Sequence, residues 1–332
     1  MGKKDIQFNL RIPEELKNKV DDAAKANKRS INAEATSRLY DSFVMNDNIQ
    51  VEAAKIVEKF LRSRSPTERK KVVAERLNLV LSELKKIHHF REFTIAELAF
   101  EIGENTADEA EAWFRAELEP TFGQLEKIAQ YTSTNPNWLF FGKQTPYDIQ
   151  SIRLNEYLEK DIKLLLGSNS NNEYLNSSKV KEIKFIRELS EAGQLIILKI
   201  YENYAVETFF PPYHISDVNG VGGYNSLLYF CLLTKILLRY YKTKVNIYSH
   251  LLSEEQFKFI LTGKAHPLTI AEKLHHIPWV DDLADRSLDG TLDYWDGFDT
   301  LRARLIQDFG AKEYIQKIWN DPELYQKHPI KF

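Results

Sequence analysis

The segment DIQFNLRIPEELKNKV, residues 5–20, changes its hydrophobic pattern at a proline and decides how the amino-terminal part of the chain is expected to fold. Before the proline every second residue is apolar, which is the pattern of a strand with one buried and one exposed face. The exposed face would carry Gln7, Asn9 and Arg11. Pro13 suits the first turn of a helix, and the two glutamates after it lie near the positive end of the helix dipole. The sequence therefore predicts a strand followed directly by a helix.

A second helix is expected after a short break. Asn27 and Lys28 interrupt the apolar stripe of the first helix, and Ser30 is a suitable N-cap for a helix that runs to about Phe43. One strand and two short helices cannot bury their apolar faces alone, and domains of this size usually need a metal, disulfides or a partner chain. The segment offers neither a cysteine nor a metal-binding pattern. We therefore expect an intertwined homodimer in which the strands of two chains pair as an antiparallel ribbon.

These features resemble the ribbon-helix-helix domain of the Arc repressor family over residues 5–45. The sequence QFNLR, followed by one residue and a proline, is close to the strand motif of that family. The resemblance implies that the ribbon enters the major groove of double-stranded DNA and that its polar side chains read base edges. Arginine can bind guanine through two hydrogen bonds, and asparagine or glutamine can bind adenine in the same way. The resemblance thus assigns base reading to Gln7, Asn9 and Arg11, and phosphate contacts to Lys3, Lys4, Ser30 and Asn32.

Three charged residues in KRSINAEATSR match a second feature of that family. Arg29, Glu34 and Arg38 fall where the family has a buried Arg, Glu, Arg network. In Arc itself, replacing this network with apolar residues raised stability, so we expect the three residues to specify the fold and not to contact DNA. The alternative for the polar strand residues is an ordinary solvated edge strand. Strand motif, proline, helix lengths and charge spacing agree over one segment, and together they favour DNA binding.

Residues 49–80 are expected to form a basic helical connector. Between residues 62 and 91 the chain carries nine Lys or Arg against three Glu. Ser65, Pro66 and Glu68 have the order of a helix start. The basic balance indicates either a solvated helix face or extra phosphate contacts through Arg69, Lys70 and Lys71, and the sequence leaves both interpretations open.

Residues 81–147 are expected to form a second helical domain. Successive short helical patterns, with LEKIAQYTSTNPNWLFFGK as the most typical part, resemble the helix-turn-helix domain of lambda-repressor-like regulators over residues 80–145. The third helix departs from that resemblance, because residues 104–119 contain six Asp or Glu and one Arg. A helix that enters the major groove must approach closely spaced phosphates and should be basic or polar. We therefore expect the fold without major-groove reading, and a role in dimerisation, protein contact or positioning of the ribbon.

Residues 148–332 predict an α/β or α+β domain for oligomerisation or sensing, and resemble no family that we recognise. The run QLIILKIYENYAVETFF predicts a hairpin, residues 224–241 a long buried helix, and KVNIYSHLL a strand. The glycines of VNGVGGYNS favour a loop and helix start over an anion site, since the phosphate-binding motifs are not matched. The histidines have no metal-site spacing and are expected at the surface; they are His250, His266, His275 and His276.

The whole chain is thus expected to be a mainly α multidomain protein without cofactor, metal or catalytic residues. Its formal charge is -3, and its one cysteine, Cys231, lies in an apolar run where a thiol packs as a small hydrophobe. One cysteine excludes an intramolecular disulfide and fits a reducing compartment, so we expect a cytoplasmic protein without membrane attachment. Residues 227–241 are too short and too charged for a membrane helix.

Three functions follow from these expectations. The leading hypothesis is a sequence-specific repressor of phage or mobile-element type. It would be a homodimer that can assemble into higher oligomers on DNA, and its carboxyl-terminal domain would bind a protein or small-molecule effector. The alternative is an antitoxin-like regulator whose carboxyl-terminal half binds a protein. The third, an enzyme fused to a regulatory head, is disfavoured because no nucleophile and base occur at a recognisable spacing.

Overall fold

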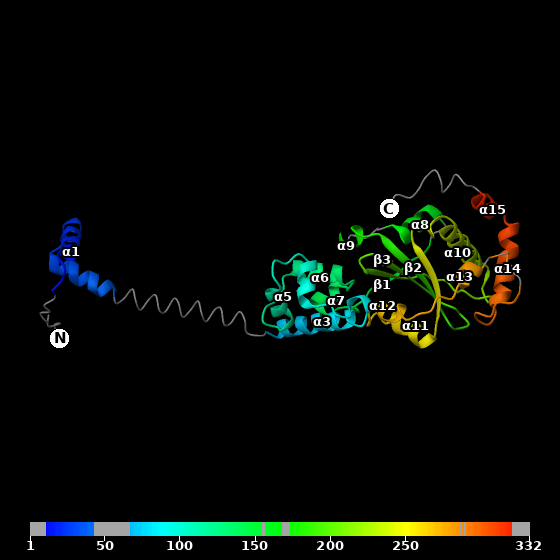
Figure 1. Cartoon of the computed structure of the whole chain (residues 1–332), viewed down its shortest axis with the longest axis horizontal. Coiled ribbons are helices and arrows are strands. Elements are labelled where there is room, and N and C mark those ends of the chain that lie inside the picture. Colours follow the sequence, from blue (N-terminus) through cyan, green and yellow to red (C-terminus); the bar gives the residue numbers. More distant parts are fainter. Residues whose placement is uncertain are drawn as a thin grey trace. The chain divides into compact units, whose positions relative to one another are not determined.

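The chain divides into two compact units, Met1–Ser65 and Pro66–Phe332. The computed structural model describes residues 11–42, 67–154, 157–167, 173–283, 285, 287–288 and 290–320 (Figure 1). Most of the predicted strand therefore lies outside the described residues, which begin at its last two positions.

Two helices make up the described part of the first unit. Helix α1 spans Glu14–Ala26, with Pro13 as its N-cap and two glutamates in its first turn. Residues 31–42 form the second helix. Ser30 caps this helix, because its Oγ accepts a 3.2 Å hydrogen bond from the backbone N–H of Ala33. Both helices predicted from the sequence are confirmed.

The second unit begins with a group of short helices, and capping residues define several of their ends. The bounds are α3 Glu68–Leu84, the 3₁₀ helix η1 His88–Phe90, α4 Ile95–Glu101, α5 Ala107–Phe114, α6 Phe122–Tyr131 and α7 Pro136–Phe141. Thr94 and Thr121 each form a capping box with the residue three positions later. Gly103 has a φ of 79°, in the left-handed region that glycine adopts freely, at the turn after α4. The helices predicted between residues 94 and 142 are confirmed.

A mixed five-stranded sheet follows. The strands are β1 Ile149–Ser151, β2 Val180–Glu188, β3 Leu195–Tyr201, β4 Val206–Phe210 and β5 Asn246–Leu252. Their order is β1-β4-β3-β2-β5. Strand β3 is antiparallel to both β2 and β4, whereas β1 is parallel to β4 and β5 is parallel to β2. The predicted hairpin is β3 and β4, and the predicted carboxyl-terminal strand is β5.

The remaining helices surround this sheet. Their bounds are α8 Leu158–Leu166, α9 Glu173–Asn176, α10 Val221–Tyr240, α11 Glu254–Leu261, α12 Leu268–Ala271, α13 Trp279–Asp282, α14 Phe298–Ala311 and α15 Glu313–Trp319. Helix α10 is long and apolar enough to cross a membrane by length and composition alone, but 61% of its most apolar window is buried inside the protein. The expectation of a buried helix in this region is confirmed.

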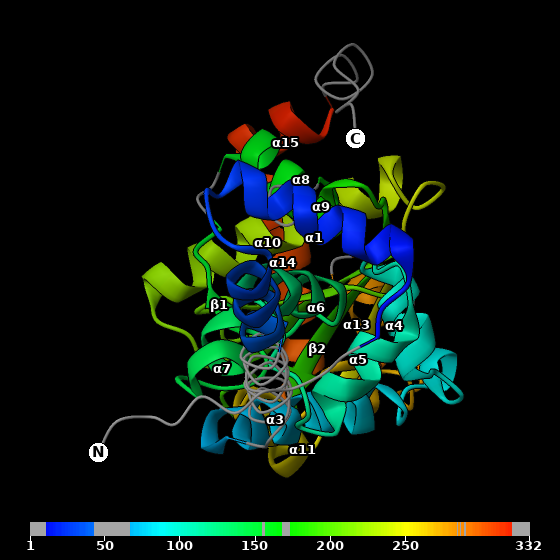
Figure 2. The same cartoon turned by 90° about the vertical axis from the view of Figure 1, so that its left-hand side faces the viewer.

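Both faces of the sheet are covered by helices, so every residue of β3 is buried. Phe185 and Ile197 are register partners on one face, where they pack in a core with α8, α10 and α14. Ile186 and Ile196 are partners on the other face, where they pack with α3–α7, α11 and α12. The sheet is thus the middle layer of three. Figure 1 shows α3, α5, α6 and α7 gathered together, away from α14 and α15 of the same unit. Figure 2, turned by 90°, adds α4 beside α5.

The domain boundaries expected at residues 80 and 147 do not separate independent bodies. Helix α3 runs through residue 80, and its buried Val73, Leu77 and Val80 belong to the core of the helices that follow. That same core continues onto the sheet through Ile196 and Leu198 of β3. The helices of residues 81–147 and the carboxyl-terminal sheet therefore fold around a shared hydrophobic core.

Candidate DNA interface of the amino-terminal unit

Arg11 is the one proposed base reader that falls within the described residues. It is exposed and lies two residues before Pro13, the N-cap of α1, outside any helix or strand. Gln7 and Asn9, with the proposed phosphate contacts Lys3 and Lys4, lie outside the described residues. The structure therefore places the end of the proposed reading strand at the start of α1, and it leaves the paired ribbon as a prediction.

The turn between the two helices brings the proposed phosphate contacts together. Lys28 has a φ of 53°, in the left-handed region, and the backbone N–H of Arg29 donates a 2.9 Å hydrogen bond to the carbonyl of Ala24. Ser30 and Asn32 follow at the start of the second helix, and both are exposed. Free backbone N–H groups at a helix start favour anions such as phosphate. This turn thus presents two short polar side chains beside such amides.

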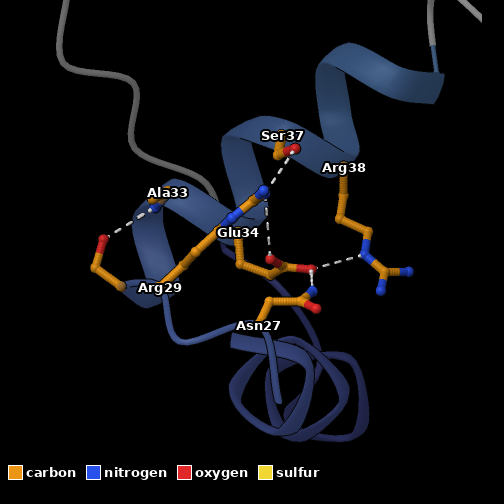
Figure 3. Close-up of polar contacts among 7 residues, drawn as sticks. Asn27, Arg29, Ala33, Glu34, Ser37 and Arg38 are labelled. Carbon is orange, nitrogen blue, oxygen red and sulfur yellow. Dashed lines mark hydrogen bonds and ion pairs between the residues drawn. The ribbon is translucent and has the colours of Figure 1, made fainter. Parts of the chain in front are cut away.

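Glu34 is the centre of a polar network that joins the two helices (Figure 3). Its carboxylate Oε1 accepts hydrogen bonds from Nδ2 of Asn27 at 3.0 Å and from Nε of Arg38 at 3.1 Å. Arg29 Nη1 lies 3.9 Å from Oε2 of the same carboxylate and also donates a 3.3 Å hydrogen bond to Oγ of Ser37. The Asn27 hydrogen bond, followed by that of Arg38, holds the pKa of Glu34 below its usual value. The structure therefore brings Arg29, Glu34 and Arg38 together and adds Asn27.

The exposure of this network differs from a fully buried one. The Glu34 side chain is 2% exposed, but those of Arg29 and Arg38 are 54% and 66% exposed. Charged side chains are rarely buried unless they are paired, and the single carboxylate can neutralise only one positive charge. In the single chain the guanidinium groups therefore keep contact with water on one side.

Arg69 and Lys70, proposed as extra phosphate contacts, are used inside the second unit. Arg69 pairs with the Glu119 carboxylate, and its guanidinium lies over the Phe122 ring, 5.3 Å from the centroid. Lys70 is 8% exposed, and its Nζ donates a 3.2 Å hydrogen bond to the carbonyl of Glu117. Lys71 is exposed. The three residues therefore form no shared basic surface, because the helix start that carries them packs against the loop after α5.

Arg115, the C-cap residue of α5, is the one arginine in the acidic segment of the helix-turn-helix resemblance, and it is paired with glutamates. Arg115 pairs with Glu111 at 2.9 Å and with Glu117 at 3.1 Å. Asp108 and Glu109 add negative charge to the first turn. Negative charge is repelled by phosphates, so the charge of this segment does not favour its entry into a DNA groove.

The expectation of surface histidines is wrong for two of the four. His250 and His266 are 2% and 1% exposed, whereas His275 and His276 are exposed. Burial lowers the pKa of His250 to about 4 and that of His266 to about 3. Among the residues that the structure describes, no three His, Cys, Asp or Glu side chains are grouped as a metal site. Cys231 is buried, as expected, and burial raises its pKa to about 12.

Sequence reasoning missed Asn27 as a partner of Glu34. Asparagine ends a helix readily through its own backbone preferences, so its position after α1 was explained without a tertiary contact. The sequence did hold one indication of the contact, because Asn27 lies only seven positions before Glu34, on the other side of the turn.

Comparison with known protein families identifies the amino-terminal segment. Residues 2–51 match the family described as Arc-like DNA binding domain, which confirms the resemblance predicted from the sequence. Neither the curated proteins nor the solved structures include a significant match to the chain. The match supports a DNA-binding regulator in general, and it lies within the first unit of the fold.

Proposed function

We propose that this protein is a sequence-specific transcriptional repressor of phage or mobile-element type. Two chains would form an antiparallel ribbon that reads the major groove through Gln7, Asn9 and Arg11 of each chain. The proposal is carried by one observation: a segment that matches an Arc-like DNA-binding domain also places Arg11 exposed beside α1 and organises both helices around Glu34.

The burial pattern of the first unit supports a homodimer. Within residues 11–42 only Ala24 and Glu34 are buried. Large apolar side chains of both helices and the preceding segment remain exposed in the single chain, namely Ile12, Leu16, Ile31, Leu39 and Tyr40. Burial of apolar surface is the dominant favourable term in folding, and so little of it cannot offset the conformational entropy of the segment. A second chain that covers these side chains supplies the missing core.

The polar features of the first unit divide by role. Ser30 and Asn32 would hold a phosphate at the amino-terminal end of the second helix and so fix the register of the ribbon on DNA. Arg29, Glu34 and Arg38 would hold the helices in place without contacting bases. Base discrimination would then rest on the strand side chains alone.

The second unit would govern oligomerisation or receive a signal. Its acidic α5 does not suit phosphates, and its three-layer fold gives it a core of its own. A large folded unit favours this role over that of an antitoxin, whose partner-binding segment is typically short and ordered only on its toxin. We propose no catalytic role for it.

A binding titration on the full chain tests the proposal. The preferred operator is first selected from a pool of random DNA duplexes, and affinity is then measured for the wild type and for Arg11→Ala. Loss of a base-reading contact should cost about 1–3 kcal/mol, roughly a 5- to 150-fold loss of affinity, and relax the preference at one base position. Lys25→Ala, which removes an exposed positive charge from α1, is the matched control and should have little effect. Unchanged affinity and base preference in Arg11→Ala would refute base reading by the ribbon.

A further inference from the structure

Three phenylalanine rings form a cluster on the second unit, here called the aromatic patch: the exposed Phe122 and Phe141 and the partly buried Phe140. Phe122 begins α6, and the other two end α7. The ring centroid of Phe122 lies 5.7 Å from that of Phe140 and 6.1 Å from that of Phe141. Phe122 is 56% exposed and Phe141 is 52% exposed. Contiguous exposed aromatic side chains mark interaction surfaces, because they lose much unfavourable contact with water on binding.

A groove continues the aromatic patch onto α3. The groove has a volume of about 370 Å³ and is lined by Phe140 and Phe141 on one side and by the start of α3 on the other. Val72 and Val73 supply its apolar wall. The patch and the groove together therefore form a surface into which an apolar side chain of a partner can insert.

The charges around this surface are balanced in sign. Arg69 pairs with Glu119 beside Phe122, and Arg76 Nη1 donates a 3.2 Å hydrogen bond to the carbonyl of Leu139. Glu68 is exposed at the groove. A nucleic acid would favour a positive rim. A rim with two arginines and two glutamates instead suits a twofold contact, in which each charge can meet an opposite charge of an identical surface.

The position of the surface in the chain also favours a second copy. The groove includes Glu68 and Arg69, which lie near the start of the second unit. The residues between the described end of the first unit and this surface, 43–66, can span at most about 80 Å when fully extended. If two first units form a dimer, two copies of this surface are held within a limited volume, and tethering of this kind raises the effective concentration of a second contact.

We propose that the aromatic patch and its groove bind the same surface of a second copy of this chain, in a twofold contact. The contact rests on the proposed function in one respect, since the dimer of first units brings the two copies together. It would give the protein two linked dimer contacts, one in each unit, and would bury rings that the single chain leaves in water.

Cysteine crosslinking on the full chain tests the contact. Gly123 adjoins Phe122, and an added Cβ there would meet no atom within 4 Å. Gly222 is a matched control, because it is also exposed near the start of a helix with open space around it. The native Cys231 is buried and does not compete for the reagent. With a short bismaleimide, Gly123→Cys should form covalent dimers at least about ten times faster than Gly222→Cys.

A second part of the crosslinking experiment removes the phenylalanine rings of the aromatic patch. In the Gly123→Cys chain, Phe122→Ala and Phe141→Ala should each slow crosslinking severalfold, toward the Gly222→Cys rate. Phe100→Ala removes an aromatic side chain that is 79% exposed and lies outside the patch, so it should leave the rate unchanged. Thermal unfolding of each variant verifies that the second unit remains folded.

The outcomes separate this contact from the proposed function. A chain that dimerises and binds DNA, but crosslinks through position 123 no faster than through position 222, overturns the contact and leaves the function. Fast crosslinking that depends on Phe141, in a chain without sequence preference on DNA, supports the contact and overturns the function. A chain that sediments as a monomer at every concentration overturns both.

Discussion

The side-chain amide of Asn27 donates a 3.0 Å hydrogen bond to the carboxylate of Glu34, and this bond ties the end of α1 to the helix that follows. It is the largest cause of the lowered pKa of Glu34. The network predicted from the sequence contained the two arginines alone. The side-chain amide of Asn27 is therefore a hydrogen-bond partner of Glu34, as Arg38 is, and it comes from the end of α1.

Replacement of Asn27 by alanine should weaken the first unit. The carboxylate would lose a hydrogen-bond donor while it stays buried, and the pKa of Glu34 should rise toward its usual value. We expect the thermal midpoint of the first unit to fall by several degrees, as is typical of one lost interaction in a small domain. Ser37→Ala is the control, because it removes a hydrogen bond to Arg29 without touching Glu34. Equal effects of both variants would contradict a special role for the amide.

Lys28→Gly should stabilise the first unit. Lys28 adopts a φ of 53°, a left-handed conformation that costs side chains about 1–2 kcal/mol and that glycine adopts freely. Glycine also loses more backbone entropy on folding, so we expect a net gain of about 0.5–1 kcal/mol. Lys25→Gly, in the helical last turn of α1, should instead destabilise by about 1 kcal/mol. Denaturant unfolding at one fixed protein concentration measures both changes, because the stability of the proposed dimer would depend on concentration.

Alanine substitutions of Lys70 and Lys71 should show whether these lysines stabilise the second unit or contact DNA. Lys70→Ala leaves the carbonyl of Glu117 without its donor, so the second unit should lose about 1–3 kcal/mol of stability. Affinity for DNA should not change. Lys71→Ala alters an exposed side chain and should change stability by less than about 0.5 kcal/mol. A clear loss of DNA affinity in Lys70→Ala, with stability intact, would restore the phosphate interpretation.

Acid should destabilise the second unit through its buried histidines. Nδ1 of His250 lies 2.8 Å from the carbonyl of His275 and carries the proton, while Nε2 is buried without a hydrogen-bond partner in the described part of the chain. Burial, with smaller contributions from Lys184 and His276, lowers the pKa of His250 to about 4, whereas an unfolded histidine titrates near 6.5. The unfolded chain therefore binds more protons between these pH values. Stability is fully present above about pH 6.5 and should fall by about 1.4 kcal/mol per pH unit for each such histidine as pH decreases.

Replacement by glutamine measures the share of this pH dependence that His250 causes. Between pH 6.5 and 4, His250→Gln should unfold with a pH slope that is smaller by one proton than that of the wild type. His214→Gln, at an exposed histidine, should keep the wild-type slope. If both variants retain the full slope, the proton uptake belongs to other groups, of which buried His266 is the next candidate.

Local patterns were sufficient for most helices and for part of the sheet. The two helices around Ser30, the helices from Thr94 to Gly142, the β3 and β4 hairpin and helix α10 follow from caps, glycines and apolar periodicity. Strand β2 was not predicted, because Lys184 and Arg187 break its apolar run. Both are buried in the structure, where backbone carbonyls accept their hydrogen bonds. A sequence pattern cannot show that such partners exist.

For the candidate site, the network around Glu34 could be predicted from the sequence, but the contacts of Arg69 and Lys70 could not. The resemblance of KRSINAEATSR to the Arc repressor family implied the network of Arg29, Glu34 and Arg38, and the structure brings these three side chains together. The partners of Arg69 and Lys70 are Glu119 and Glu117, which lie in the loop after α5, about fifty positions later in the chain. Contacts across that separation depend on tertiary packing, and charge counts alone could not distinguish an internal pair from a phosphate contact.

The shared core of α3–α7 and the sheet has a practical consequence for anyone who expresses parts of this protein. A fragment that stopped at residue 147 would lose the part of this core that the sheet supplies, and its complement would lose the helices that cover Ile196 and Leu198 of β3. Both pieces would be expected to aggregate. The natural cut is at residue 66, so the helix-turn-helix-like segment has to be cloned together with the sheet on which it rests.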